Sequence, residues 1–340
     1  MSTIDYVTGL RRVIGTRPVN LVGAAGIIVN GDGELLLLRR AGAENWGLVT
    51  GISELGESLS ETLRREALEE TGLRIGAVEL LEMLIRIPFV SCRNRNSADP
   101  STPRPEPVFL LLALLGLRVF PTPFNRSPYQ SCRAGPGGER RSFLQLHRPV
   151  PRDRLEWNTC ARQPRNRGRT VLLTGSLAPV DPSGPQSPGV AGMNYVRDLR
   201  ALIGHAPVNW VGVCALVVNA ENEVLLQRRT DTGGWGTPGG IAELGEPLPE
   251  TLRRELWEEA SITPIHPEFL TVISGPQTYQ KLPNGDEFYQ VVAVYVVREW
   301  HGVPVPDGEE GTELRFFSLD HLPAPLGPVD GEALGLLRVR

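Results

Sequence analysis

The chain has 340 residues, of which 22% are charged, and its formal net charge is −4 at pH 7. This balance excludes a global basic field for nucleic acid, and the length suits two domains, each with its own core. The four cysteines form no CxxC pair and no zinc spacing, and the N-terminus has no cleavable leader, which favours a reducing cytoplasm. The most apolar stretch, Val108 to Leu117, is too short to span a bilayer.

An internal repeat begins close to the N-terminus. YVTGLRRVIGTRPVNLVG from Tyr6 aligns without a gap with YVRDLRALIGHAPVNWVG from Tyr195, an offset of 189 residues. In the second copy Tyr195, Leu199 and Ile203 lie four residues apart, which predicts a short amphipathic helix that ends at Gly204. The chain is therefore a duplication, and each copy is expected to begin with this helix.

A β-hairpin is predicted next in each copy. The second copy has the β-branched run VGVCALVVN, the turn-like Asn-Ala-Glu-Asn and then EVLLQRR, and the first has GAAGIIVN, Gly-Asp-Gly and ELLLLRR. Further strands are expected at VELLEML in the first copy and at EFLTVIS, VVAVYVVREW and LRFFSLD in the second.

Between these strands each copy carries a run of acids. The two stretches are GISELGESLSETLRREALEETGL from Gly51 and GIAELGEPLPETLRRELWEEASI from Gly240. On a helix, Glu255, Glu258 and Glu259 lie at i, i+3 and i+4 and share one face. Crowded carboxylates repel one another unless a cation lies between them, and Mg²⁺ or Mn²⁺ is the natural partner for oxygen ligands. The first copy repeats this arrangement with Glu66, Glu69 and Glu70.

Both stretches resemble the Nudix box, the 23-residue signature Gx5Ex7REUxEExGU of hydrolases that cut nucleoside diphosphates linked to another group. The second copy matches it through Gly240, Glu246, Arg254, Glu255, Leu256, Glu258, Glu259 and Ile262, with Ser261 where glycine is usual. The first copy matches it through Gly51, Glu57, Arg65, Glu66, Glu69, Glu70, Gly72 and Leu73, with Ala67 at the aliphatic position. A Glu-rich helical run alone is typical of a solvated face, but its recurrence in a matching context favours a site.

The resemblance implies an α/β fold: a duplicated Nudix-type α/β/α sandwich with a mixed sheet, in which the box forms a loop, a helix and a loop. It implies that the carbonyl of Gly239 joins Glu255, Glu258 and Glu259 as metal ligands, with Glu66, Glu69 and Glu70 as the counterparts in the first copy. It also implies that Arg254 orients Glu255 and that Glu246 holds this network.

The reaction implied is hydrolysis of a phosphoanhydride by water, with one carboxylate accepting the proton of the water. Candidates for this base are Glu255 and Glu259 in the box and, outside it, Glu287, Glu309 and Glu310. Arg229, whose equivalent is Arg40, matches a position that holds substrate phosphate in relatives. Tyr279 lies 17 residues beyond the box, near the place where diadenosine-polyphosphate hydrolases carry a tyrosine.

The expected substrate is a small-molecule nucleotide, with nucleoside triphosphate cleaved to monophosphate and pyrophosphate as the first choice. ADP-ribose, dinucleoside polyphosphates and polyphosphate stay open as alternatives. Some Nudix-like domains bind nucleotides without hydrolysing them, and this alternative stays open for the first copy in particular. We expect no membrane and no specific nucleic acid as partners, and a homodimer is compatible with the sequence.

Three segments are expected: an incomplete first copy over residues 1–85, a divergent segment over 86–190 and a complete second copy over 191–340. From about Ile85 the first copy shows no counterpart to the later strands of the second. The segment 86–190 is crowded with Pro, Arg and Ser, and a basic arm, an unstructured linker or an out-of-frame remnant would each explain it, with the last two favoured. Its one piece suited to a buried strand or helix is PVFLLLALLGLRVF.

Overall fold

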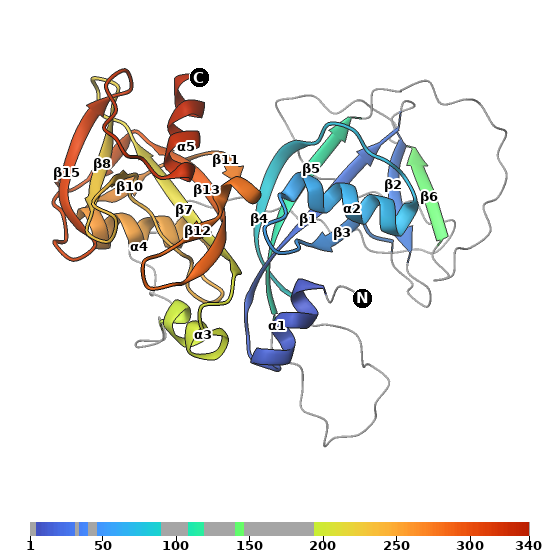
Figure 1. The fold of residues 1–340 in the computed structure, drawn as a ribbon. Coiled ribbons are helices and arrows are strands. Elements are labelled where there is room, and N and C mark those ends of the chain that lie inside the picture. The colour runs from blue at the N-terminus through green and yellow to red at the C-terminus, as the bar shows by residue number, and fades with distance from the viewer. Residues whose placement is uncertain are drawn as a thin grey trace, which may run out of the picture.

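The structure is a computed structural model, and it describes residues 5–30, 34–39, 46–89, 108–118, 140–145 and 194–339. Figure 1 shows two α/β halves side by side, with α1 and α3 at the junction between them. No helix in these described ranges has the length and apolar content needed to cross a membrane.

The first half is built on a mixed sheet with the strand order β4-β5-β1-β2-β6, and β3 pairs with β1. Only β5 runs parallel to its neighbour β1, and the other pairs are antiparallel. The elements are α1 (Tyr6–Ile14), β1 (Asn20–Val29), β2 (Glu34–Arg39), β3 (Val49–Ile52), α2 (Leu59–Thr71), β4 (Glu79–Phe89), β5 (Val108–Arg118) and β6 (Arg140–Gln145).

In the second half, β7 runs parallel to β13, which also pairs with β11 and β12, while β8 pairs with β15 and β9. A separate two-stranded sheet joins β10 to β14. The elements are α3 (Tyr195–Ile203), β7 (Val208–Val217), β8 (Glu223–Arg229), β9 (Trp235–Gly236), α4 (Leu248–Ala260), β10 (Thr263–Ile265), β11 (Glu268–Ile273), η2 (Pro276–Thr278), β12 (Gln280–Lys281), β13 (Glu287–Val297), β14 (Glu299–His301), β15 (Gly311–Ser318) and α5 (Pro328–Arg338).

The strands β5 and β6 correct the expectation that the first copy has no counterpart beyond Ile85. β5 is parallel to β1 and antiparallel to β4, as β13 is to β7 and β11. β6 pairs with β2 in the register that β15 adopts on β8, since Gln145 faces Glu34 as Ser318 faces Glu223. Ladder hydrogen bonds come from the backbone, so a strand can be kept while its side chains diverge. The limits at 85 and 190 stay a prediction, because most of the intervening segment lies outside the described residues.

The two box helices start differently and end alike. In α2 the Ser58 hydroxyl accepts from the Glu61 amide, and the Glu61 carboxylate accepts from the Ser58 amide, which is the capping box that the sequence predicts. α4 begins after Pro247 without a side-chain cap. The helices end at Gly72 and Ser261, both in the left-handed conformation.

The second half is a three-layer sandwich, because β7 is covered on both faces. Alternate side chains of a strand point to opposite faces. Val211, Val213, Ala215 and Val217 share a core with α4, and Cys214, Leu216 and Val218 share another core with α5. The spacing of Leu248, Leu252 and Leu256 predicts the buried face of α4, and all three are fully buried.

The two copies also share a core at their junction, where α1 contacts α3 and β1 contacts β7. Its buried members are Leu10, Ile14, Val19 and Leu21 from the first half and Tyr195, Leu199, Val208, Trp210 and Phe288 from the second. The halves therefore dock largely through the segments that begin each copy of the repeat, from α1 to β1 and from α3 to β7.

Candidate active site

The loop before α4 places backbone beside the box acids. The carbonyls of Pro238 and Gly240 accept hydrogen bonds from β7 amides at 2.8 and 2.9 Å, so the loop runs along that strand. Gly239 has φ +149°, and a Cβ there would lie 2.3 Å from the Val213 carbonyl oxygen. A Cβ on Gly240 would lie 2.4 Å from the Glu255 carboxylate. Position 239 therefore requires glycine, whereas a side chain at position 240 would displace the Glu255 carboxylate.

Two carboxylates of α4 are buried against this loop. Glu259 is 2% exposed, and its Oε2 accepts from the Gly239 amide at 2.8 Å. Burial raises the pKa of Glu259 to about 8, against the opposing effect of that hydrogen bond. Burial likewise raises the pKa of Glu255 to about 7, although Arg254 lies beside it. Buried carboxylates that resist ionisation are typical of a site that a cation completes.

Arg254 links the remaining acids of the box. Its Nε and Nη2 donate to the two oxygens of Glu246, each at 2.9 Å, in a bidentate pair. Its Nη1 donates to Glu255 Oε1 at 2.8 Å and to Glu258 Oε2 at 3.0 Å. Glu246 also accepts from the Glu243 amide and the Thr251 hydroxyl. These contacts are the ones expected for an arginine that orients Glu255 and a glutamate that holds the arginine.

The first copy repeats the network with its own residues. Arg65 donates from Nε to Glu57 at 2.9 Å, from Nη1 to Glu66 at 2.7 Å and from Nη1 to Glu69 at 3.4 Å. Its glycine loop differs, because Thr50 lies in the regular strand β3, opposite Ala25 of β1. The first copy thus keeps the charged set, including Glu70 on α2, but lacks the conformation that Gly239 gives the second.

The donor type at this site fits Mg²⁺ or Mn²⁺, since every candidate side chain offers carboxylate oxygens. As the side chains lie, no group of three or more His, Cys, Asp or Glu residues in the described ranges is gathered to hold a metal. Glu258 is turned to Arg254 and Glu259 to the Gly239 amide. The Glu258 side chain is 55% exposed, so it has room to turn toward the other two carboxylates.

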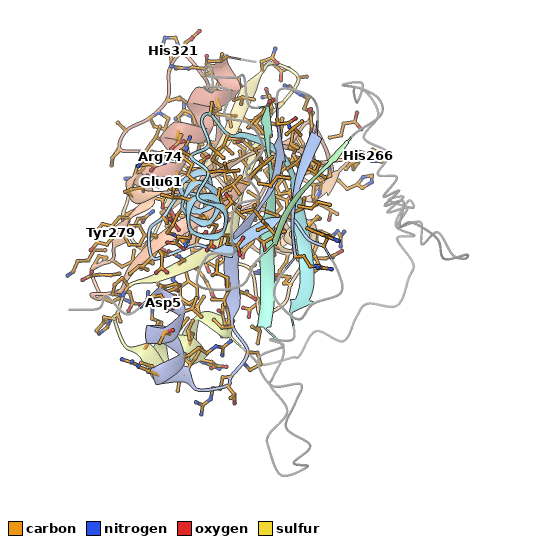
Figure 2. The ribbon with its side chains drawn as sticks, turned by 90° about the vertical axis from the view of Figure 1, so that its right-hand side faces the viewer. Asp5, Glu61, Arg74, His266, Tyr279 and His321 are labelled. Atoms are coloured by element: carbon orange, nitrogen blue, oxygen red, sulfur yellow. The ribbon has the colours of Figure 1, made fainter. Side chains whose placement is uncertain are left out.

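The two residues predicted to bind substrate lie on different elements, Arg229 at the end of β8 and Tyr279 directly after η2. Arg229, at the end of β8, forms a bidentate pair with Asp231 at 2.9 and 2.8 Å. This pair is the main cause that raises the pKa of Arg229, and the charge of Glu259 adds to it. Tyr279 donates its hydroxyl to Glu287 at 3.0 Å, beside Tyr289. In Figure 2, Tyr279 projects outward on the same side as Glu61 of α2. Arg40 lies outside the described residues.

Among the acids outside the box that are candidates for the base, Glu310 interacts with the site through its charge. Burial is the main cause of the raised pKa values of Glu255 and Glu259, and the charge of Glu310 raises both further. Glu287 instead accepts from Lys281 at 2.8 Å and from Tyr279, both on or beside the β12–β13 hairpin. The charge interaction with Glu255 and Glu259 therefore favours Glu310 over Glu287 as an acid near the box.

Two residues at this site were not found from the sequence. Gln227 on β8 is fully buried beside Glu259. Its amide lowers the pKa of Glu259 and so opposes the effect of burial. Neither the nitrogen nor the oxygen of this amide has a partner with good hydrogen-bond geometry. Its equivalent in the first copy is Leu38, so one polar residue in an apolar strand was the available signal. Asp330 on α5 accepts from the Thr237 amide at 2.8 Å and hydroxyl at 2.6 Å. Nothing in the local sequence indicates that contact.

The model of the NUDIX domain matches residues 19–118 and 208–337, which is more than half of the chain. The chain belongs to the Nudix family. Both copies are therefore Nudix domains, and the match to the first extends past residue 85 into β5.

Curated relatives of this Nudix chain are similar to it over part of their length. It is 29% identical over 110 residues to an ADP-ribose pyrophosphatase of Methanocaldococcus jannaschii, covering 32% of this chain and 61% of that protein. It is 43% identical over 63 residues to a MutT-like protein of Streptomyces ambofaciens, covering 18% and 41%. A crystal structure of a MutT NUDIX hydrolase from Burkholderia pseudomallei is 29% identical, covers 38% of this chain and 98% of that one, and has a TM-score of 0.34. The chain thus spans less than two thirds of these two curated relatives.

Proposed function

We propose that this Nudix protein is a metal-dependent pyrophosphohydrolase whose second copy carries the principal site. The observation that carries the proposal is the pair of buried carboxylates, Glu255 and Glu259, held by Arg254 and by the Gly239 amide. Burying acids without a cation costs free energy, so two buried carboxylates on α4, packed against the glycine loop, favour a cation-dependent task.

The substrate class proposed is a nucleoside diphosphate linked to another group. Nucleoside triphosphates, cleaved to monophosphate and pyrophosphate, are the first candidate. ADP-ribose is the second, because a relative 29% identical over 110 residues is named as an ADP-ribose pyrophosphatase. Water adds to one phosphorus, the bridging P–O bond breaks, and a carboxylate takes the proton of the water. A bound Mg²⁺ or Mn²⁺ would neutralise the phosphate oxygens and lower the pKa of that water.

Each site residue has a proposed task. The Gly239 carbonyl with Glu255, Glu258 and Glu259 would hold the cation, and Glu66, Glu69 and Glu70 would do so in the first copy. Arg254 keeps Glu255 in place and is itself held by Glu246. Arg229 is proposed to hold phosphate, since its side chain lies close enough to Glu259 for the two charges to interact. The exposed ring of Tyr279, beside the half-buried ring of Tyr289, is proposed to stack on a base.

The first copy is proposed as a weaker catalyst or as a nucleotide-binding module. It keeps the arginine network, but it has Thr50 and Leu38 where the second copy has Gly239 and Gln227. A cytoplasmic location, a nucleotide as the partner and the three segment limits also remain proposals.

Turnover of nucleoside triphosphates and ADP-ribose, measured with Mg²⁺ and with Mn²⁺, tests the function on the full chain. The variant Glu258→Gln/Glu259→Gln should lose nearly all turnover, whereas Glu69→Gln/Glu70→Gln, its counterpart in the first copy, should keep most of it. The assignment to the second copy fails if the two double variants exchange these results. A full chain inert with both substrates and both metals would overturn the proposed activity.

A further inference from the structure

Asn20 of β1 and Asn209 of β7 occupy equivalent positions in the two copies, and each reaches into the other copy. Asn20 Oδ1 accepts from the Gly245 amide at 3.0 Å, and its Nδ2 donates to the carbonyls of Ala242 at 3.3 Å and Glu243 at 3.1 Å. In the opposite direction, Asn209 of the second copy accepts at Oδ1 from the Gly56 amide of the first copy at 3.0 Å, and its Nδ2 donates to the Glu54 carbonyl at 3.1 Å. The two sets of contacts join equivalent residues in opposite directions, since Gly56 and Gly245 also occupy equivalent positions in the repeat.

A pair of tyrosines fixes the backbone of each asparagine. The Asn20 amide donates to the Tyr195 hydroxyl at 3.0 Å, and the Asn209 amide donates to the Tyr6 hydroxyl at 3.2 Å. Asn209 is 6% exposed and Tyr195 is 7% exposed, so water cannot readily replace these bonds. The asparagine of each copy is thus paired with the tyrosine of the other, so the junction resembles a two-fold symmetric interface within one chain.

The loop that Asn20 holds leads directly into the box network. Residues 242–245 end one position before Glu246, and the Glu243 amide donates to Glu246 Oε2 at 3.0 Å. Glu246 is the bidentate partner of Arg254, which in turn contacts Glu255 and Glu258. A shift of the loop therefore moves the arginine that sets two of the three α4 carboxylates.

We propose that Asn20 of the first copy is a positioning residue for the site of the second copy, and that the first copy serves as the built-in partner of that site. The proposal rests on the proposed function of the second copy. Asn209 does the same for the first copy's loop of Glu54 to Gly56. Loss of the Asn20 side chain removes the partner of the Gly245 amide and one partner each of the Ala242 and Glu243 carbonyls, so the loop rearranges.

The reciprocal pair supplies a matched control for the test. We compare Asn20→Ala with Asn209→Ala in full-length protein carrying Glu70→Gln, so that turnover reports on the second copy. Both substitutions remove an asparagine from the same junction, and similar falls in melting temperature are expected. Only Asn20→Ala is expected to lower kcat, by about 10- to 100-fold, with a smaller change in KM. The isosteric Asn20→Asp keeps the acceptor for Gly245 and places an oxygen against the two carbonyls, and it should also lower kcat.

Hydrogen–deuterium exchange tests the same contact without an activity assay. Asn20→Ala should speed exchange in residues 242–246 and Asn209→Ala in residues 54–57, each in the opposite copy. Equal kcat values for the two alanine variants, or unchanged exchange in 242–246, would overturn the positioning role while the parent stays active. A parent without turnover marks failure of the proposed function instead, and the role in catalysis falls with it.

Discussion

The guanidinium of Arg254 donates from Nη1 to Glu258 Oε2 at 3.0 Å, one helical turn away. The same nitrogen contacts Glu255, so a single donor lies between two proposed metal ligands. A cation held by Glu255 and Glu258 would compete with this donor for their carboxylate oxygens, whereas the bidentate pair of Arg254 with Glu246 would lie outside that competition. Arg254 thus places positive charge beside two of the carboxylates proposed to hold the cation.

Replacing Arg254 by lysine tests this arrangement. Lysine keeps the charge but cannot make the bidentate pair with Glu246, so we expect kcat to fall about 10- to 100-fold. Arg65→Lys is the matched change in the first copy and should affect turnover far less. Steady-state kinetics at saturating Mn²⁺ checks both, and equal effects would contradict the principal role of the second copy.

The raised pKa values of Glu255 and Glu259 predict how the metal-free protein responds to pH. The folded protein binds more protons than the unfolded chain between the ordinary carboxyl pKa, about 4.5, and the folded values of about 7 and 8. The free energy of unfolding therefore falls as pH rises through that window. Glu259→Gln should flatten the dependence, because it removes one titrating group.

Urea denaturation in EDTA at several pH values from 5 to 8 measures this dependence. Glu221→Gln, at an exposed position, controls for the general loss of a negative charge. Saturating Mn²⁺ should oppose the fall, because a cation favours the ionised carboxylates. A wild-type protein whose stability rises between pH 5 and 8 in EDTA would rule out the burial argument.

Gln227→Leu installs in the second copy the residue that the first copy has at the equivalent position, Leu38. The substitution removes two buried amide atoms that lack full hydrogen bonds, so we expect the free energy of unfolding to rise by about 1–3 kcal/mol. It also removes a group that opposes the raised pKa of Glu259, so the low-pH limb of the kcat profile should move to higher pH. Lower stability together with an unchanged pH profile would show that Gln227 has neither effect.

Gly239→Ala tests the required conformation of the loop. The new Cβ would lie 2.3 Å from the Val213 carbonyl oxygen at a φ of +149°, so we expect a loss of stability of more than about 1 kcal/mol and loss of turnover. Gly331→Ala on α5 is the control, since no atom lies within 4 Å of its Cβ position. Helical alanine is favoured over glycine, so this control should gain up to about 1 kcal/mol. Thermal unfolding compares the two.

Structural features that depend on residues only a few positions apart could be predicted from the sequence. The spacing of Leu248, Leu252 and Leu256 predicts the buried face of α4, and Ser58 with Glu61 predicts the capping box of α2. Periodicity and capping are local, so they can be read without the fold. Divergent strands could not be found in this way: β6 pairs with β2 in the register of β15 on β8, although its sequence differs from that of β15 at most positions.

The duplicated box and its acids were thus determined by the sequence alone, because residues three and four apart on a helix must share a face. The groups that surround these acids become visible in the folded chain alone. Gln227, Asp330 and Asn20 reach the box from another strand, from α5 and from the other copy, and their separations in sequence carry no periodic signal. Burial and cross-copy hydrogen bonds exist only after the sheets pack, and that packing brings the two halves together.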